Sequence, residues 1–455
     1  MVSLRIKWPQ ASCGSDAWIS TSAPHRQRPH AAASSPLAAR TTVPTGSGSA
    51  EMQPLSGIRV LDFSKVLAGP LCGQWLGDLG AEVVKIEPPE AGDDTRGWPP
   101  FREGPGGRAG AVFLSANRNK RSLALDLKTP EGQAAARRMA AEADVVIESY
   151  ATGVAERLGI GADALCAANP RLVHCSISGF GRTGPLAKGL GYDVILQAFS
   201  GIMAMTGERG GGPIRSPFSP IDQSTGMHAY SGILAALLER GRTGRGCRLE
   251  VSLFETAAAL LGYNLQIYWE KGVLPEKSGS GHESLCPYQA FEASDGPVLI
   301  GIASDNLWRR FAAGIDRPEL AEDPRFRTNA DRVRHFADTV ALVQGIAATR
   351  TVAEWVEFCG RIGIPCAAIN TLLEMLEHPH TAARGIVLDY EHPALGPLKT
   401  MAQPIQFDGQ PRKVASPPPL LGEHSGQVLA GYGFTAEEIA ALRAAGAIRG
   451  AGDAT

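Results

Sequence analysis

The amino-acid sequence predicts an α/β fold with a mostly parallel sheet and a second, smaller α+β domain. From residue 58 to about residue 180, short apolar runs alternate with segments of helical periodicity. Repeated β-α-β units of this kind favour a parallel sheet that helices cover on both faces. The pattern changes near residue 270, and extended segments return after about residue 385. The 455 residues are enough for two or three domains.

The first part of the chain supplies the predicted parallel strands. Pro70 suits the first position of the first helix, and Gly80 suits its end. Thr129 is the expected N-cap of the next helix, because Pro130 follows it and Glu131 lies in the first turn. Strands are predicted at 58–63, 82–87, 122–127, 144–149 and 172–178, and helices at 70–80, 129–143 and 161–169.

The later part of the chain has a different character. Residues 224–241 form the clearest amphipathic helix, and residues 247–255 alternate with a period of two, as a half-buried strand does. Two apolar runs around Ser294, Asp295 and Gly296 predict a hairpin within residues 287–303. Further predictions are helices near 305–315 and 351–363, extended segments at 385–407, a linker at 416–425 and a final helix at 435–448.

Composition excludes several classes of protein. The formal net charge is −2, which gives no electrostatic reason to expect a nucleic acid or membrane partner. No apolar run reaches 18 residues, so no transmembrane helix is expected. The eight cysteines include no C-x-x-C pair and are interpreted as small buried hydrophobes in a reducing, cytoplasmic compartment.

Residues 1–51 differ from the rest of the chain and are predicted to be a disordered extension. They are rich in Ala, Ser, Pro and Arg, and only Asp16 and Glu51 are acidic. The favoured interpretation is an upstream extension ahead of a start at Met52. The alternative is a transit peptide, which would make the protein mitochondrial.

The stretch SISGFGRTGP, residues 176–185, contains the pattern G-x-G-x-x-G after a predicted strand. A dinucleotide site needs a helix to begin at the last glycine, but Gly189 and Gly191 follow within seven residues of Gly184. The expected acidic residue is also missing from a strand end, since its candidate, Glu208, lies in a loop. The glycines are therefore predicted to shape a loop at the carboxyl end of a parallel strand, where open α/β folds bind ligands.

A carboxylate, Asp222, stands just before the predicted helix at 224–241. The helix dipole would favour its ionised form by about 0.3–1 kcal/mol. On spacing alone, Asp222 or Ser224 could simply be the N-cap of that helix. Elsewhere, His378 and His380 lack a third convergent ligand, so no metal site is predicted.

Four blocks of the sequence carry a resemblance to a known family, at residues 54–96, 115–128, 169–185 and 225–246. They are similar to blocks of the class III CoA-transferases, the formyl-CoA transferase and carnitine CoA-transferase (CaiB/BaiF) group. The blocks lie in the same order as in that family, and the similarity runs from Met52 to about Ile448. The resemblance implies a large Rossmann-like, CoA-binding domain formed by residues 52–270 and 380–450, a small α+β domain at 275–375, and an interlocked homodimer.

The resemblance implies that Asp222 is a nucleophile that attacks the thioester of a donor acyl-CoA and forms a mixed anhydride. Tyr192 matches an active-site tyrosine of the transferases. In the racemases of the same family a histidine occupies that position, and tyrosine is a poor general base near neutral pH. Acyl-CoA racemization or epimerization and non-catalytic CoA binding remain the alternative functions. No permanently bound cofactor is implied; coenzyme A enters as part of the substrate.

The resemblance also implies a set of CoA-binding residues. A diphosphate and a 3′-phosphate call for scattered basic side chains around an apolar adenine slot. The matching or neighbouring positions are Val66, Ala68, Leu125, Lys128, Tyr150 and Arg157, with Asn119, Lys120 and Arg121 as possible additional contacts or as a solvated turn.

Two departures from formyl-CoA transferase bear on the substrate. Leu67 replaces a glutamine and Pro88 an arginine of that enzyme, which argues against oxalate or formyl-CoA. The pattern is more similar to that of succinyl-CoA-dependent transferases that act on dicarboxylic acids such as glutarate, malate or mesaconate. The family's glycine-rich active-site loop has a short counterpart at 278–283, in which His282 is a candidate for the acyl pocket or for a structural role.

Overall fold

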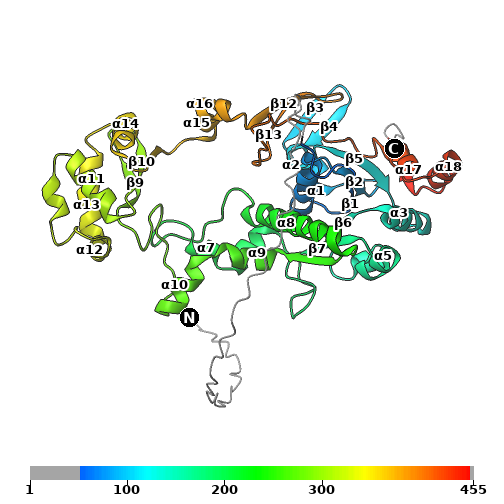
Figure 1. The fold of residues 1–455 in the computed structure, drawn as a ribbon, viewed down its shortest axis with the longest axis horizontal. Coiled ribbons are helices and arrows are strands. Elements are labelled where there is room, and N and C mark those ends of the chain that lie inside the picture. Colours follow the sequence, from blue (N-terminus) through cyan, green and yellow to red (C-terminus); the bar gives the residue numbers. More distant parts are fainter. Residues whose placement is uncertain (1–51, 451–455) are drawn as a thin grey trace, which may run out of the picture. The chain divides into compact units, whose positions relative to one another are not determined.

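A parallel sheet organises most of residues 52–450, the part of the chain that the computed structural model describes (Figure 1). The strand order is β14-β5-β2-β1-β6-β7-β8, with every pair parallel except β14 and β5. This confirms the predicted α/β class with a mostly parallel sheet. The predictions for residues 1–51 lie outside the described residues. The strands are β1 (Arg59–Asp62), β2 (Glu82–Glu87), β5 (Lys120–Leu125), β6 (Val145–Glu148), β7 (Val173–Ser178), β8 (Arg248–Ser252) and β14 (Ile448–Arg449).

Both faces of this sheet are buried. Val60 and Leu61 are neighbours on β1 with no exposed surface, yet they belong to two different hydrophobic clusters. One cluster packs against α1 (Ala68–Asp78) and α8 (Pro220–Thr243). The other packs against α3 (Pro130–Glu142), α5 (Ala162–Ala168) and α17 (Ser425–Gly431). Strands covered on both sides need continuous apolar runs, which is the pattern that the sequence shows.

Several predicted boundaries were wrong. Helix α1 begins at Ala68, so Pro70 is its third residue rather than its first. Helix α8 begins at Pro220, four residues before the predicted start, because a proline with its fixed φ suits the first helical position. The last helix, α18 (Ala436–Ala444), stops before Gly446, which has a φ of +69°, and the chain then enters β14.

A separate antiparallel sheet with its own core follows in the chain. Strands β9 (Tyr288–Glu292) and β10 (Pro297–Gly301) form the predicted hairpin, and β11 (Cys366–Ala368) pairs with β10. Trp308, Phe311 and Trp355 fill this core. The packing is of the α+β type, while the boundaries at 275 and 375 stay a prediction. The helices of this segment are α11 (Asp305–Gly314), η2 (Pro318–Ala321), α12 (Asn329–Arg334), α13 (Phe336–Ala347) and α14 (Val352–Ile362).

The remaining elements are mostly short and lie between the principal ones. The extended segments predicted after residue 385 form a second antiparallel hairpin of β12 (Val387–His392) and β13 (Gly396–Met401). The others are η1 (Asp94–Gly97), β3 (Phe101–Gly104), β4 (Gly107–Gly110), α2 (Ala111–Ala116), α4 (Val154–Arg157), α6 (Asp193–Phe199), α7 (Ile202–Met205), α9 (Leu253–Leu260), α10 (Tyr263–Lys271), α15 (Leu372–Glu377) and α16 (Pro379–Arg384).

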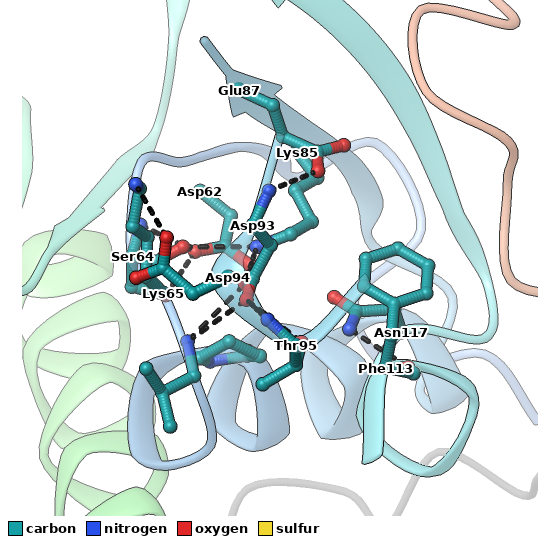
Figure 2. A network of polar contacts seen from close by, with 12 residues as sticks. Asp62, Ser64, Lys65, Lys85, Glu87, Asp93, Asp94, Thr95, Phe113 and Asn117 are labelled. Atoms are coloured by element: carbon teal, nitrogen blue, oxygen red, sulfur yellow. Dashed lines mark hydrogen bonds and ion pairs between the residues drawn. The ribbon is translucent and has the colours of Figure 1, made fainter. Parts of the chain in front are cut away.

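A buried ion cluster lies at the carboxyl ends of β1 and β2 (Figure 2). We use this name for Asp62, Lys85, Asp93 and Lys120, whose side chains are almost completely buried. Lys85 Nζ lies 2.9 Å from Asp93 Oδ2, and Lys120 Nζ lies 2.9 Å from Asp62 Oδ2. Burial acts to raise the pKa of both carboxyl groups, but their partners outweigh it. Lys120 and Lys85 lower the pKa of Asp62, and Lys85 with hydrogen bonds from Thr95 lowers the pKa of Asp93 to about 2.

The cluster is saturated with hydrogen bonds. Lys120 also donates to the Pro70 carbonyl at 2.7 Å and to Asn117 Oδ1 at 2.9 Å. Lys85 donates to the Ser64 carbonyl at 2.9 Å. Buried charges are tolerated only where partners replace water in this way. The cluster therefore ties β1, β2 and β5 to the start of α1.

We predict that Lys120→Met destabilises the fold by about 3–5 kcal/mol, because it leaves Asp62 buried without its ion-pair partner. The matched control is Arg121→Met at the next position, since the Arg121–Glu82 pair is about one-third exposed on both sides. That change should cost about 0–1 kcal/mol. Urea unfolding of both variants measures the difference, and equal losses would contradict a structural role for the cluster.

Candidate active site

A cavity of about 270 Å³ opens at the carboxyl edge of the parallel sheet. Its walls are the loops that follow β1, β6 and β7, together with the first turn of α8. Strands β2 and β6 flank β1 on opposite sides, so the chain changes direction along the sheet between β1 and β6. Open α/β sheets bind ligands at such a switch point. The backbone N–H of Lys65 donates to Ser149 Oγ at 3.0 Å and joins the two loops there.

A second cavity of about 130 Å³ lies beside the ends of β2 and β5. Leu125 and Lys128 line it, as does Pro88. Lys65 and Tyr150 belong to the walls of both cavities. The pair of cavities therefore offers an elongated ligand a path from the switch point to the end of β5.

The loop after β1 has a constrained backbone. Val66 has a φ of +71°, in a region that a β-branched residue rarely adopts. The carboxylate of Asp93, a member of the buried ion cluster, accepts a hydrogen bond from the Val66 backbone N–H at 3.2 Å. Val66, Leu67 and Ala68 all line the larger cavity, as their predicted roles require. The ion cluster thus holds this loop in a strained shape at the cavity wall.

Of the predicted adenine and phosphate contacts, three line the second cavity and Arg157 does not. Leu125, Lys128 and Tyr150 lie together around the second cavity, and burial raises the pKa of the Tyr150 hydroxyl to about 12. Arg157 is exposed at the end of α4 and is not part of either cavity wall, although its neighbour Leu158 lines the second cavity.

Asn119, Lys120 and Arg121, the suggested additional contacts, line neither cavity. These residues lie at the amino end of β5, whereas the ligand edge of a parallel sheet is the carboxyl end. Lys120 is buried in the ion cluster, and Arg121 pairs with Glu82. Asn119 accepts hydrogen bonds from the backbone N–H groups of residues 415 and 416, so it anchors the C-terminal segment instead.

Asp222 is the third residue of α8, and it lines the larger cavity. It is not the N-cap, because that position belongs to Ser219, and Ser224 lies further inside the helix. Burial, reinforced by the nearby carboxylate of Asp193, raises the pKa of Asp222 to about 7. A carboxylate with this pKa is partly ionised at neutral pH and is a stronger nucleophile than an ordinary aspartate.

The glycine-rich loop brings Tyr192 to the same cavity. The backbones of Gly179 and Gly191 touch so closely that a Cβ on Gly179 would lie 2.9 Å from Gly191 Cα. Tyr192 follows directly and is the N-cap of α6, with 58% of its surface exposed. Gly181 and Gly184 have φ values of +93° and +82°, so they shape the turns of the loop. The predicted strand-end loop is present, and no helix begins at Gly184.

His282 lies apart from this arrangement in the single chain. Its ring stacks on Tyr263 and meets Tyr288 edge to face, and it is not part of either cavity wall. His282 Nδ1 accepts a hydrogen bond from the Ser284 backbone N–H at 3.1 Å. Within one chain these contacts favour the structural role that the sequence left open.

Sequence reasoning missed four residues at the site: Lys65, Asp93, Lys188 and Asp193. Lys65 and Lys188 add positive charge to the wall of the larger cavity. Asp93 is recognisable as an N-cap, because its side chain accepts from the Thr95 backbone N–H at the start of η1. Nothing in the spacing of Asp193 indicates that it reaches α8, 28 residues away.

Among residues 52–450 no group of three or more His, Cys, Asp or Glu side chains is placed to hold a metal ion. None of the helices in the same range is long and apolar enough to cross a membrane.

Comparison with known proteins assigns the family. A family model described as CoA-transferase family III matches residues 55–425. The succinyl-CoA:glutarate CoA-transferase of Mus musculus is 37% identical over 83% of this chain and 86% of its own length. The succinate–glutarate CoA-transferase of Agrobacterium fabrum is 38% identical over 83% of this chain and 95% of its own length. The crystal structure of a CaiB/BaiF family protein from Brucella suis has a TM-score of 0.74 and 36% identity, over 84% of this chain and all of that one.

The cavities lie at the carboxyl edge of a parallel sheet, and a partly buried aspartate at the start of a helix lines the larger one. These features agree with the similarities, and the chain belongs to the family III CoA-transferases.

Proposed function

We propose that the protein transfers coenzyme A from succinyl-CoA to a free dicarboxylic acid, with Asp222 as the nucleophile. The observation that carries the proposal is the position of Asp222: partly buried, on the cavity wall, and without a hydrogen bond to its carboxylate from any described residue. The names of the mouse and Agrobacterium relatives support succinyl-CoA as donor and glutarate as one acceptor.

The proposed reaction balances without an oxidant or ATP. The Asp222 carboxylate attacks the thioester carbonyl of the donor, the C–S bond breaks, and a mixed anhydride and a CoA thiolate result. The thiolate attacks the Asp222 carbonyl, releases succinate and leaves an aspartyl thioester. The acceptor carboxylate then displaces the thiolate to form a second anhydride. The thiolate finally attacks the acyl carbonyl of that anhydride, which releases the new CoA thioester and restores the Asp222 carboxylate.

The two cavities fit the shape of the donor. The adenine end of coenzyme A would lie against Leu125 and Tyr150, with Lys128 close enough to meet phosphate charge. The pantetheine would follow the backbone of Val66 and Ala68 towards Asp222. Lys65 contributes positive charge where the two cavities meet, although it also lies 3.5 Å from Asp94.

Tyr192 supports transfer over racemization. Racemization requires a general base that removes the proton next to the thioester carbonyl near pH 7. A tyrosine hydroxyl is a weak general base at that pH. No histidine is among the residues that line the larger cavity. His174 lies within β7, with its Nε2 against the Ile160 carbonyl at 3.3 Å, so it does not replace the missing base.

The proposed enzyme works as a homodimer. Trp269 and Tyr263 on α10 and Leu372 on α15 are 65%, 60% and 80% exposed in the single chain. Large apolar side chains in such numbers favour burial against a partner. The interlocked arrangement that the family resemblance implies would bury such side chains between two copies of the chain, and His282 lies beside Tyr263.

We predict that Asp222→Asn lowers the rate of CoA transfer at least about 10³-fold, because the amide removes the nucleophile while keeping nearly the same volume. Binding of coenzyme A, measured by calorimetry, should change by less than about threefold. Residual transfer near the wild-type rate would contradict the assignment of Asp222. Loss of binding together with rate would indicate that the residue supports the fold instead.

We predict that kcat for transfer rises with pH through about 7 in the wild-type enzyme. The ionised form of Asp222 attacks, and its raised pKa means that the ionised fraction grows about tenfold between pH 6 and pH 8. Measuring kcat with succinyl-CoA and glutarate as a function of pH tests for this rise. A profile that is flat from pH 5 to pH 8 would show that Asp222 titrates at its ordinary value.

We predict that succinyl-CoA incubated with a panel of free acids yields new CoA thioesters of dicarboxylic acids, detected by mass spectrometry. Glutarate, malate and mesaconate are the first acceptors to test. The competing racemase function predicts deuterium uptake at the α-carbon of a 2-methylacyl-CoA in D₂O. Deuterium uptake without any CoA transfer would show that the protein is a racemase instead. Binding of CoA without either reaction would show that it is a non-catalytic CoA-binding protein.

A further inference from the structure

Helix α8 begins without a cap of its own. Ser219 is its N-cap residue, but the Ser219 side chain makes no hydrogen bond to the helix. Pro220 follows and has no backbone N–H. The N–H groups of Ile221 and Asp222 are therefore the first that need an acceptor from outside the helix.

Asp193, on helix α6, supplies that acceptor. Its Oδ2 atom accepts from the Ile221 N–H at 2.8 Å and from the Asp222 N–H at 3.1 Å. Asp193 is 7% exposed, so the contact is sheltered from water. One carboxylate oxygen on a different helix thus satisfies both amide groups.

Gln197, one turn further along α6, orients Asp193. The Gln197 side-chain amide donates to Asp193 Oδ1, and Gln197 Oε1 accepts from the Ser216 backbone N–H at 2.9 Å. Asp193 and Gln197 together hold two points of the segment that leads into α8, at residue 216 and at residues 221–222. The start of the helix is therefore fixed relative to α6 and to Tyr192, its N-cap.

Three other helices of this protein show what an acidic third residue does when no external cap is present. Glu354, Glu374 and Glu438 are each the third residue of a helix, and each accepts a hydrogen bond from the backbone N–H of its threonine N-cap. This capping box lowers the pKa of each glutamate. Asp222 occupies the same position in α8, yet it makes no such bond and its pKa is raised.

We propose that Asp193 is a positioning residue for Asp222: it caps the first turn of α8 from outside and so leaves the Asp222 carboxylate free of hydrogen bonds on the cavity wall. The proposal rests on the proposed function, in which Asp222 is the nucleophile. A second consequence follows from charge, because a carboxylate beside Asp222 disfavours its ionised form. Asp193 would therefore act through both geometry and charge.

Other charged or titratable groups also lie on the wall of the larger cavity. They are Lys65, Asp94, Tyr150, Arg182, Lys188 and Tyr192. Arg182 is engaged by Glu148 at 2.7 Å, and Lys65 lies near Asp94. Among the described residues, Asp193 is the charged neighbour that contributes to the raised pKa of Asp222, after burial.

The test compares Asp193→Asn, Asp193→Ala and the control Ser219→Ala. Asparagine keeps an oxygen that can accept from the two amides but removes the charge, so the rise of kcat with pH should move to lower pH. Alanine removes the cap as well, so kcat should fall about 10- to 100-fold while KM for succinyl-CoA changes less than about threefold. Ser219→Ala should match the wild type, because the Ser219 side chain makes no capping bond.

A readout without turnover separates this inference from the proposed function. Carbon-13 in the side-chain carboxyl groups of aspartate allows the Asp222 signal to be assigned by difference against Asp222→Asn and titrated by NMR. The Asp222 pKa should fall in Asp193→Asn even if no acid tested is an acceptor. An unchanged pKa in that variant, or a Ser219→Ala enzyme as impaired as Asp193→Ala, would overturn the proposal. A wild-type enzyme that transfers CoA to no acid would instead overturn the proposed function.

Discussion

The buried ion cluster is the constraint on which the ligand edge of the sheet depends. Two lysines with almost no exposed surface, Lys85 and Lys120, neutralise two aspartates next to the loop that follows β1. Figure 2 shows Asp62, Lys85 and Asp93 of this cluster. Water cannot replace a missing partner there, so all four charges must be present together. Asp93 uses one carboxylate to hold Lys85, the start of η1 and the Val66 backbone N–H. The strained φ of Val66 follows from its hydrogen bond to Asp93, because the loop must turn the Val66 N–H inward towards that carboxylate.

The start of α8 shows the opposite arrangement. The ion cluster satisfies every charge, whereas Asp222 is left without a cation or a hydrogen-bond donor among the described residues. Leaving a carboxylate unpaired in a partly buried place costs stability, which functional sites commonly tolerate for reactivity. The saturated network supports the loop after β1 through the hydrogen bond from Val66 to Asp93, and that loop lines the same cavity as Asp222. One wall of the cavity is thus held firmly, while another carries an unpaired carboxylate.

The sequence predicted the elements whose signals are local. Alternating apolar runs located β1, β2, β5, β6 and β7, and the threonine–proline pair at 129–130 located α3. It placed Asp222 near the start of a helix and Tyr192 at the end of a glycine-rich loop. It failed where a contact joins distant positions. In the sequence Lys120 follows an arginine and an asparagine, and this stretch resembles a solvated basic turn. In the structure the Lys120 side chain reaches Asp62, 58 residues earlier. The cap from Asp193 to α8 and the pairing of β14 with β5 are tertiary contacts of the same kind, and no periodicity records them.

The position of β14 affects how the protein can be made. The edge of the parallel sheet at β5 is completed by residues near the end of the chain: Ser425 Oγ accepts from the Ala124 backbone N–H, 301 positions earlier, and Ile448 pairs with Leu125. Leu125 is also a wall of the second cavity. A nascent chain on the ribosome therefore has β5 long before it has β14, and its sheet edge stays open during most of synthesis. The strand pairing beside Leu125 is therefore completed late, and until then the open edge of β5 is free to pair with other strands.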